Sequence, residues 1–494
     1  MKKIAQHSFE LTVFVGGATI MILELTASRV LAPHIGTSTF VWTSIIGIIM
    51  ASLSIGYYFG GKLADKNKNP RTLSFLILGA SLLVGLTALI KDPVIVSFGF
   101  IEDVRITGII GTILLFAPAS ILLGTIAPYS IRLSLEKIAT SGSVVGRLGA
   151  LSTIGSIVGT FLTGFFLLSY FGNTKILVML SVLLALTSLL PLLAIKSPKI
   201  KTAAIIIALT TLVGHSLMPP TINALTLDTS YSDVMIYDTT QRNTERPIRI
   251  LQMSATTHSA MFLDDPDELV FPYSKFYHLD KYYVPEPKKA LILGGGAYSY
   301  PKEFLKRFPA ATIDVVEIDP KLTELAREHF DLQDDPRMNI YHQDARVFLN
   351  RNQEKYDIIY LDAFNSTYSI PYQLTTIEVA KMLEESLTDD GVILMNIISS
   401  LEGDKSKLFR SEYHTYEPVF PSIEVFPVFS STDSDMVQNI ILAIRKTTTT
   451  PPENPLEYDT QLNNLWTKSI PNDLPILTDE FAPVDQYVME VLKK

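Results

Sequence analysis

The sequence predicts an N-terminal α-helical transmembrane bundle of about seven spans, followed by a doubly wound α/β (Rossmann) domain. Long apolar segments are confined to residues 1–218. From residue 286 onward, short apolar runs alternate with amphipathic helical patterns, which is typical of βαβ units. Between them, residues 231–263 alternate in the manner of β-strands. We therefore assign 1–218 to a transmembrane domain, 219–285 to a β-hairpin region and 286–494 to the α/β domain.

Composition supports this division and excludes several classes of protein. The chain has 494 residues, of which 47% are hydrophobic and only 18% charged, so it is too apolar for a purely soluble protein and long enough for two domains. A net charge of −9 without a basic stripe argues against a nucleic-acid partner. Cysteine is absent, which rules out disulfides, thiolate metal sites and a thiol nucleophile.

Seven segments are long and apolar enough to cross a bilayer, which takes roughly 20 residues each. The first carries Glu24 and Arg29 too deep, and is too long, to be a cleaved signal peptide. We therefore expect a multi-pass protein of the cell membrane whose lipid-facing spans lie near residues 9–29, 39–60, 73–90, 107–130, 148–170, 175–195 and 202–218.

The distribution of positive charge predicts the orientation of these spans. Twelve Lys and Arg residues fall in alternate connections, whereas the opposite connections hold only Lys91, Arg105 and Lys175. Because positive residues collect on the cytoplasmic side, the N-terminus is expected inside. Seven spans then place the C-terminal domain outside the cytoplasm. The seventh span is short and rich in Ala and Thr, and the domain returns to the cytoplasmic side if that segment is re-entrant.

Polar and small residues within the spans carry further expectations. A charge near the bilayer centre is costly, so Glu24 is expected to face the bundle interior, either in a binding or transport role or in a structural polar contact. Gly56 and Gly60, like Gly155 and Gly159, have the spacing that lets two helices approach closely. We expect both glycine pairs to serve packing.

The most informative stretch begins at a strand-like apolar run, Ala290–Leu293, that stops at Gly294, Gly295 and Gly296 and gives way to a helical pattern. Glycines allow left-handed dihedrals and a close approach of a ligand to the backbone. A second apolar strand, 312–316, ends in Glu317. In nucleotide-binding βαβ units, an acid about twenty residues after the glycines binds the ribose hydroxyls.

Two more strand ends carry residues of the same kind. A third strand closes with Asp344 and Ala345, and a fourth, 356–361, closes with Asp362. In an open parallel sheet these ends lie along one crevice, so the ordered set favours a site for an adenosine-type ligand. The alternative is a doubly wound domain in which the acids merely cap helices.

These motifs resemble those of the polyamine aminopropyltransferases, the spermidine synthase family, which have a methyltransferase-like fold. The segments that carry the resemblance are GGGAYS at 294–299, VEID at 316–319, QDA at 343–345 and DAFNS at 362–366. The stretch around Glu24, Trp42 and 56–65 resembles the membrane half of bacterial membrane-fused spermidine synthase homologues.

The resemblance implies a role for each position. S-adenosylmethionine or its decarboxylated form would be the cosubstrate, with no metal, and the acceptor would be a small amine such as a polyamine. Asp362 would be the catalytic base, and Tyr273, Tyr298 and Asn365 would contact the substrate. A homo-oligomer formed through the β-hairpin region is also implied. The positions implied to bind the adenosyl cosubstrate are Gly294, Gly295, Gly296, Glu317, Ile318, Asp344, Ala345 and Gln252.

Two positions depart from the family pattern. Ala297 stands where the family has a loop acid, and Asn365 replaces the second acid of the DSSDP-like segment. A cationic propylamine end needs a carboxylate partner, so we expect an altered acceptor, an altered donor or no transfer. Three hypotheses follow: a membrane-bound aminopropyltransferase-like enzyme, another S-adenosylmethionine-dependent enzyme (a methyltransferase or a sulfonium-cleaving enzyme), or a non-catalytic sensor or transporter that binds an adenosyl ligand or a polyamine.

Overall fold

The computed structural model divides the chain into two compact units, Met1–Ile222 with Leu227–Asp233, and Asn223–Thr226 with Val234–Lys494. We describe each unit by itself. The residues described are 2–35, 38–98, 101, 103–136, 140–194, 202, 205–207, 209–211, 213, 224–229, 231–241, 244–253, 256–362, 370–448 and 459–492.

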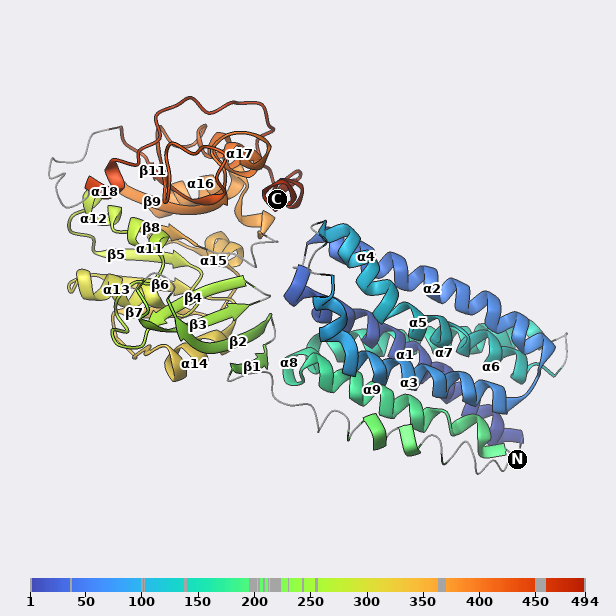
Figure 1. Ribbon diagram of the computed structural model, residues 1–494. Coiled ribbons are helices and arrows are strands. Elements are labelled where there is room, and N and C mark those ends of the chain that lie inside the picture. The colour runs from blue at the N-terminus through green and yellow to red at the C-terminus, as the bar shows by residue number, and fades with distance from the viewer. Residues whose placement is uncertain are drawn as a thin grey trace. The chain divides into compact units, whose positions relative to one another are not determined.

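Between residues 2 and 194, the regular structure of the described residues is helical (Figure 1). Two of its helices begin at side-chain caps, since Asn69 accepts a hydrogen bond from the Arg71 N–H and Asp103 accepts one from the Arg105 N–H. The helices are α1 (Lys2–Ile35), α2 (Thr39–Lys66), α3 (Pro70–Val96), α4 (Val104–Leu115), α5 (Ala117–Gly124), α6 (Ile126–Ser134), α7 (Ser141–Leu162), η2 (Thr163–Leu167), α8 (Leu168–Tyr170), α9 (Asn173–Thr187) and η3 (Leu190–Ala194).

Within the described residues, five helical stretches are long and apolar enough to cross a membrane. A sixth span is formed if α4 is combined with α5 and α6, which meet at a bend of 53°. These six correspond to the first six segments expected from the sequence. The expected seventh segment, 202–218, lies largely outside the described residues, so a total of seven spans stays a prediction.

Glycine positions determine how closely two helix pairs approach. A Cβ added to Gly155 or Gly159 of α7 would collide with the backbone carbonyl of Phe14 or Ala18 of α1. On α2, a Cβ on Gly56 would collide with the carbonyl of Ile121 in α5. The small residues therefore permit backbone-to-backbone contact between helices, as expected from their spacing.

The C-terminal unit contains two sheets (Figure 1). The smaller has the order β1-β2-β3-β4, with β2, β3 and β4 antiparallel. Its strands are β1 (Ala224–Asp228), β2 (Asp233–Thr240), β3 (Pro247–Met253) and β4 (Thr256–Phe262), and two short helices follow, α11 (Pro272–Phe276) and α12 (Leu279–Tyr283). Strand β1 was not expected from the sequence.

The larger sheet has seven strands in the order β10-β11-β9-β8-β5-β6-β7. Strands β9, β8, β5, β6 and β7 are parallel, and β11 is antiparallel to both of its neighbours. The strands are β5 (Lys289–Leu293), β6 (Thr312–Val316), β7 (Met338–Tyr341), β8 (Tyr356–Leu361), β9 (Leu387–Ser399), β10 (Ser422–Pro427) and β11 (Gln438–Arg445). This mixed sheet is that of a methyltransferase-like α/β domain.

Helices cover both faces of the large sheet because its strands are apolar on both sides. One core packs the sheet against α15, α16, α17 and α19, and the other packs it against α11, α12, α13 and α14. The remaining bounds are α13 (Ser299–Arg307), α14 (Pro320–His329), α15 (Ala345–Arg351), η4 (Tyr372–Leu374), α16 (Ile377–Ser386), η5 (Asp404–Ser406), α17 (Lys407–Tyr416), α18 (Asp459–Leu462) and α19 (Val484–Val491).

Candidate active site

The strand register brings three of the expected site residues to one level of the sheet edge. Leu293 of β5 is paired with Val316 of β6 and with Leu361 of β8. The residues that follow these three are Gly294, Glu317 and Asp362. The triple glycine, the first acid and the last acid therefore lie side by side at the carboxyl edge of the sheet, where doubly wound domains bind ligands.

The glycine loop adopts the conformation that its residues allow. Gly294 has φ 104° and Gly296 has φ 52°, both in the left-handed region. A Cβ on Gly295 would lie 2.9 Å from the ring of Tyr298 and 3.2 Å from Cβ of Glu317. The loop is thus held tightly against its neighbours, and helix α13 begins directly after it.

Glu317 is buried and holds the glycine loop. Its Oε2 accepts hydrogen bonds from the N–H groups of Gly295 (2.9 Å) and Gly296 (3.1 Å), and its Oε1 accepts one from Asp319 N–H (2.9 Å). Burial raises the pKa of this carboxyl, while the backbone hydrogen bonds oppose the rise. The neighbouring Ile318 is 37% exposed and offers an apolar surface at the same edge.

Asp362 is partly buried and has two neutral hydrogen-bond donors. Tyr273 Oη donates to Oδ2 at 3.2 Å, and Asn396 Nδ2 donates to Oδ1 at 3.0 Å. Burial raises the pKa of Asp362 to about 6, against the opposing effect of these hydrogen bonds. Asn396 is itself oriented by Asn439 of β11, whose Nδ2 donates to its Oδ1 at 2.9 Å.

Asp344 begins helix α15 and lies beyond the end of its strand. Strand β7 ends at Tyr341, and the Asp344 Oδ1 caps the helix by accepting from Val347 N–H at 3.0 Å. Helix capping is the alternative role that the sequence analysis left open for these acids. The second carboxylate oxygen of Asp344 has no hydrogen bond among the described residues. Ala345 is packed against the adjoining core.

Tyr298 is in a different position from the one expected of a substrate contact. Its side chain is fully buried, and its hydroxyl is hydrogen-bonded to Thr323 of α14 at 2.7 Å. The left-handed backbone at Tyr298, with φ 59°, turns the ring under the glycine loop. We correct the expectation accordingly: Tyr298 supports Gly295 from below.

Of the two remaining expected residues, Gln252 and Asn365, the structure describes only Gln252. Gln252 lies on β3, where its Oε1 accepts from Tyr237 Oη at 3.3 Å, and no contact among the described residues joins it to the glycine loop. Asn365 lies outside the described residues. The neighbouring strand β4 does reach the loop, because Ser259 Oγ accepts from Ala297 N–H at 3.1 Å.

Ser259 and Asn396 were missed by the sequence analysis. Met395 is paired with Leu361, so Asn396 is level with Asp362, although its own strand β9 continues to Ser399. The strand-end rule that found Asp362 could not find Asn396, because Asn396 lies within the apolar run 392–397. Ser259 gives no such signal either, because it lies within an alternating strand and acts through a contact 38 residues away in the chain.

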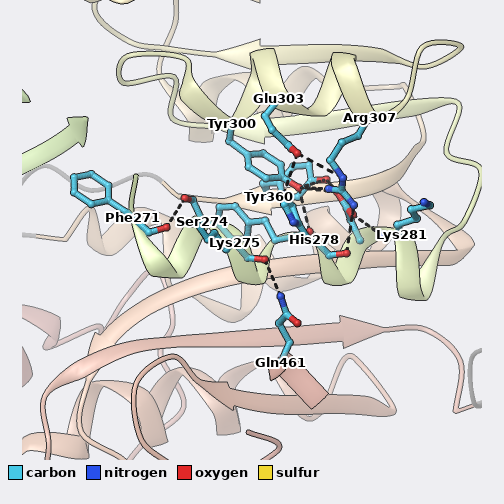
Figure 2. Close-up of polar contacts among 12 residues, drawn as sticks. Phe271, Ser274, Lys275, His278, Lys281, Tyr300, Glu303, Arg307, Tyr360 and Gln461 are labelled. Atoms are coloured by element: carbon cyan, nitrogen blue, oxygen red, sulfur yellow. Dashed lines mark hydrogen bonds and ion pairs between the residues drawn. The ribbon is translucent and has the colours of Figure 1, made fainter. Parts of the chain in front are cut away.

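A buried ion pair joins α12, which follows the Tyr273-bearing helix α11, to α13. Asp280 of α12 is fully buried, and its carboxylate accepts hydrogen bonds from Tyr300 and Tyr360, both at 2.6 Å, and from Arg307 Nη2 at 2.9 Å. In Figure 2, the side chains of Tyr300, Tyr360 and Arg307 come together beside these short helices.

Among the described residues, no group of three or more His, Asp or Glu is arranged to hold a metal ion.

Fold and site together define an α/β domain of the methyltransferase-like class, with acids along its carboxyl edge. Residues 271–446 match the family model of the spermine/spermidine synthase domain. The C-terminal half of the chain therefore carries a spermine/spermidine synthase domain, and the chain is a homologue of the polyamine aminopropyltransferases.

Individual relatives agree with this assignment. The polyamine aminopropyltransferase of Vibrio vulnificus is 28% identical over 222 residues, which are 43% of this chain and 70% of that protein. Polyamine aminopropyltransferase 2 of Aquifex aeolicus is 23% identical over 410 residues, 78% of each chain. The latter match covers more of the chain than residues 234–494 provide, so it extends into the N-terminal helices.

A solved structure, that of a probable spermidine synthase from Corynebacterium glutamicum, is similar with a TM-score of 0.40 and 24% identity. It covers 47% of this chain and 82% of that one.

Proposed function

We propose that the protein is a membrane-bound, spermidine synthase-like enzyme that transfers an aminopropyl-type group from S-adenosylmethionine or its decarboxylated form to an amine. The observation that carries this proposal is the position of Asp362. Its carboxylate lies level with Gly294 and Glu317 at the sheet edge, and Tyr273 and Asn396 hold its two oxygens. A proton acceptor is thus fixed beside the loop that would hold the nucleotide.

The reaction is an in-line displacement. The amine lone pair forms an N–C bond to the carbon attached to the sulfonium, and the S–C bond breaks with its electron pair remaining on sulfur. The products are methylthioadenosine, the neutral thioether that either donor leaves, and the amine alkylated by an aminopropyl group (decarboxylated donor) or an aminocarboxypropyl group (intact donor), whose extra proton passes to Asp362. Since the sulfonium is a good leaving group, the enzyme has mainly to orient the partners and accept this proton.

The other residues at the sheet edge support nucleotide binding. Among the described residues, Glu317 Oε1 receives a single backbone N–H, which leaves a lone pair for a ribose hydroxyl. Ile318 offers an apolar surface, and the second oxygen of Asp344 is free to accept from the adenine amino group. The glycine backbone would pass under the tail of the donor.

At the end of the site that would bind the acceptor amine, the residues differ from the family pattern. Ala297, at the position of the family's loop acid, is 1% exposed and presents no carboxylate. This observation keeps a second candidate open, another S-adenosylmethionine-dependent enzyme that cleaves the sulfonium or transfers its methyl group.

Attachment to a membrane is supported by the N-terminal unit. Besides its five long apolar stretches, it exposes large apolar side chains on α2 and on the segment α7–η2, such as Met50 (60%), Phe59 (57%), Phe161 (57%) and Phe165 (75%). Surfaces of this kind suit a lipid environment. We retain a cytoplasmic N-terminus, with the C-terminal domain outside if seven spans cross and inside if the last is re-entrant.

The test is to incubate the purified full chain with intact or decarboxylated S-adenosylmethionine, with and without a diamine. Methylthioadenosine that forms from either donor only when an amine is present, together with the alkylated amine, supports the proposal. Methylthioadenosine from the intact donor alone indicates sulfonium cleavage, and S-adenosylhomocysteine indicates methyl transfer. Binding without any product would contradict an enzymatic function and support a sensor or transporter.

A further inference from the structure

The segment 476–481 is folded onto the starts of two helices that lie far from it in the sequence. Asp479 accepts a hydrogen bond from Arg346 Nη2 at 2.6 Å and one from Thr376 Oγ1 at 2.7 Å. Its own N–H donates to Glu378 Oε2 at 3.0 Å. Arg346 belongs to α15, whereas Thr376 and Glu378 form the N-cap and first turn of α16. One aspartate therefore joins the starts of both helices.

The backbone on both sides of Asp479 is itself held in place. Leu477 is fully buried, and its carbonyl accepts from the Ile377 N–H at 2.9 Å. Thr478 and Phe481 exchange two backbone hydrogen bonds of 3.0 Å each, which close a tight turn around Asp479. Asp479 is thus presented to the two helices by an ordered turn.

Both helix starts give up a local preference when they make these contacts. Thr376 is the N-cap residue of α16, where a threonine hydroxyl usually accepts from a backbone N–H, but its hydroxyl donates to Asp479 and makes no cap bond. Arg346 lies in the first turn of α15, where the helix dipole disfavours a positive charge. Departures from local preference that converge on one group are expected at functional positions.

Arg346 connects the turn to the proposed nucleotide site, because it follows Asp344 by two residues. Besides its bond to Asp479, its Nη1 donates to the Gln373 carbonyl and to Thr376 Oγ1, both at 3.3 Å. The side chain is only 15% exposed. A planar guanidinium with acceptors on several sides has one preferred placement, so it restricts the first turn of α15 and, with it, the Asp344 that caps this helix.

We propose that Asp479, acting through Arg346, positions Asp344 to accept a hydrogen bond from the adenine amino group of the nucleotide. Asp479 and Arg346 are positioning residues that fix the start of α15. A carboxylate placed in this way selects a purine with an amino group over one with an oxygen in its place, since two acceptors repel. The inference rests on the proposed function, which takes Asp344 to contact the adenine.

The test compares the wild-type full chain in detergent with three variants. Asp479→Ala removes the carboxylate, and Arg346→Lys keeps the charge but loses the planar fork. Glu480→Ala is the matched control, because it removes the neighbouring exposed acid of the same turn. Calorimetry measures the affinities for methylthioadenosine and for methylthioinosine, in which an oxygen replaces the adenine amino group. Hydrogen exchange of the backbone amides of residues 345–351 reports on α15 without a ligand.

We expect the wild type and Glu480→Ala to bind methylthioadenosine at least about tenfold more tightly than methylthioinosine. Asp479→Ala and Arg346→Lys should reduce this preference to about threefold or less, mainly by weakening methylthioadenosine. In both, exchange at the start of α15 should become at least about tenfold faster. A contact that only stabilised the fold would weaken the two nucleosides equally.

The inference is overturned if the preference is absent from the wild type, if it survives in both Asp479→Ala and Arg346→Lys, or if these variants weaken the two nucleosides equally. A wild type that binds neither nucleoside contradicts the proposed function and the inference together. Binding of methylthioadenosine with unchanged preference and unchanged exchange in every variant contradicts the inference alone.

Discussion

Asp362 is held by neutral donors on both oxygens and has no cationic partner among the described residues. A carboxylate in an ion pair would be acidic and a poor proton acceptor, whereas burial raises the pKa of Asp362 to about 6. The group is therefore ionised at neutral pH and still basic enough to take a proton from an amine. Because Asp362 combines ionisation with sufficient basicity, we assign it as the base.

The pKa predicts a pH dependence of activity. Because the ionised form is required, protonation of Asp362 should lower kcat/KM by about tenfold per pH unit below pH 6, in addition to the effect of protonating the acceptor amine, which continues above pH 6. Tyr273→Phe removes a hydrogen bond that lowers the pKa, so its acidic limb should move to higher pH. Initial rates with a saturating donor measure both profiles, and a wild-type profile that is flat from pH 5 to 7 would remove Asp362 from the proton transfer.

Single site residues were predictable where the strand-end rule applied. Gly294, Glu317 and Asp362 follow apolar runs directly, and the register places them at one level. Tyr298 was misassigned because its direction is set by a left-handed backbone and by packing against α14, neither of which has a pattern in the sequence.

At the scale of elements, the Asp280–Arg307 pair fixes α12 against α13, and α11, which carries Tyr273, immediately precedes α12. Removing one partner of a buried ion pair leaves a buried charge and costs about 3–5 kcal/mol. An exposed pair contributes about 0–1 kcal/mol. The domain offers a matched control in Arg327 and Asp334, whose side chains are 42% and 85% exposed.

Arg307→Ala should therefore destabilise the domain by about 3–5 kcal/mol, and Arg327→Ala by about 1 kcal/mol or less. Denaturant titration of the full chain in a Trp42→Phe background, followed through the fluorescence of Trp466, gives both values. Equal losses for the two variants would show that the buried pair does not fix these helices.

The glycine loop gives a second element-scale prediction. Gly295→Ala would place a Cβ 2.9 Å from the Tyr298 ring, so the loop must shift, and we expect methylthioadenosine affinity to fall at least about tenfold. Tyr298→Phe keeps the ring and removes only the hydrogen bond to Thr323, and it should bind nearly as the wild type does. Calorimetry measures the affinities of both variants. An unaltered affinity in Gly295→Ala would show that the loop does not take part in binding the ligand.

The succession of strands along the chain was predictable, because strands that are buried on both faces of a sheet are continuous apolar runs in the sequence. Strands β6 and β8 have the bounds that the sequence indicated, 312–316 and 356–361. Strand β1 was missed because it lies in a short polar stretch, and β9 is longer than the apolar run 392–397 because it begins at Leu387, before Gly391. Backbone pairing adds such residues to a sheet without an apolar signal.

For the whole molecule, the absence of cysteine makes the membrane orientation testable with single-cysteine variants. Asn67→Cys lies between α2 and α3 on the side expected to be cytoplasmic, and Ser97→Cys lies after α3 on the opposite side. In intact cells, a membrane-impermeant maleimide should label only Ser97→Cys, whereas Asn67→Cys should react after permeabilisation. The reverse pattern would contradict the orientation, and Thr432→Cys reports the side of the C-terminal domain.

The central claim is that Asp362 accepts the proton of an amine that displaces an adenosyl sulfonium. In the most direct test, decarboxylated S-adenosylmethionine and 1,4-diaminobutane are added to membranes that contain the full chain. Methylthioadenosine and the aminopropylated amine are then quantified in the same sample. We predict equal amounts of the two products, with turnover reduced at least about a thousandfold in Asp362→Asn while methylthioadenosine still binds. Absence of the aminopropylated product from the wild type, or full activity in Asp362→Asn, would contradict the account.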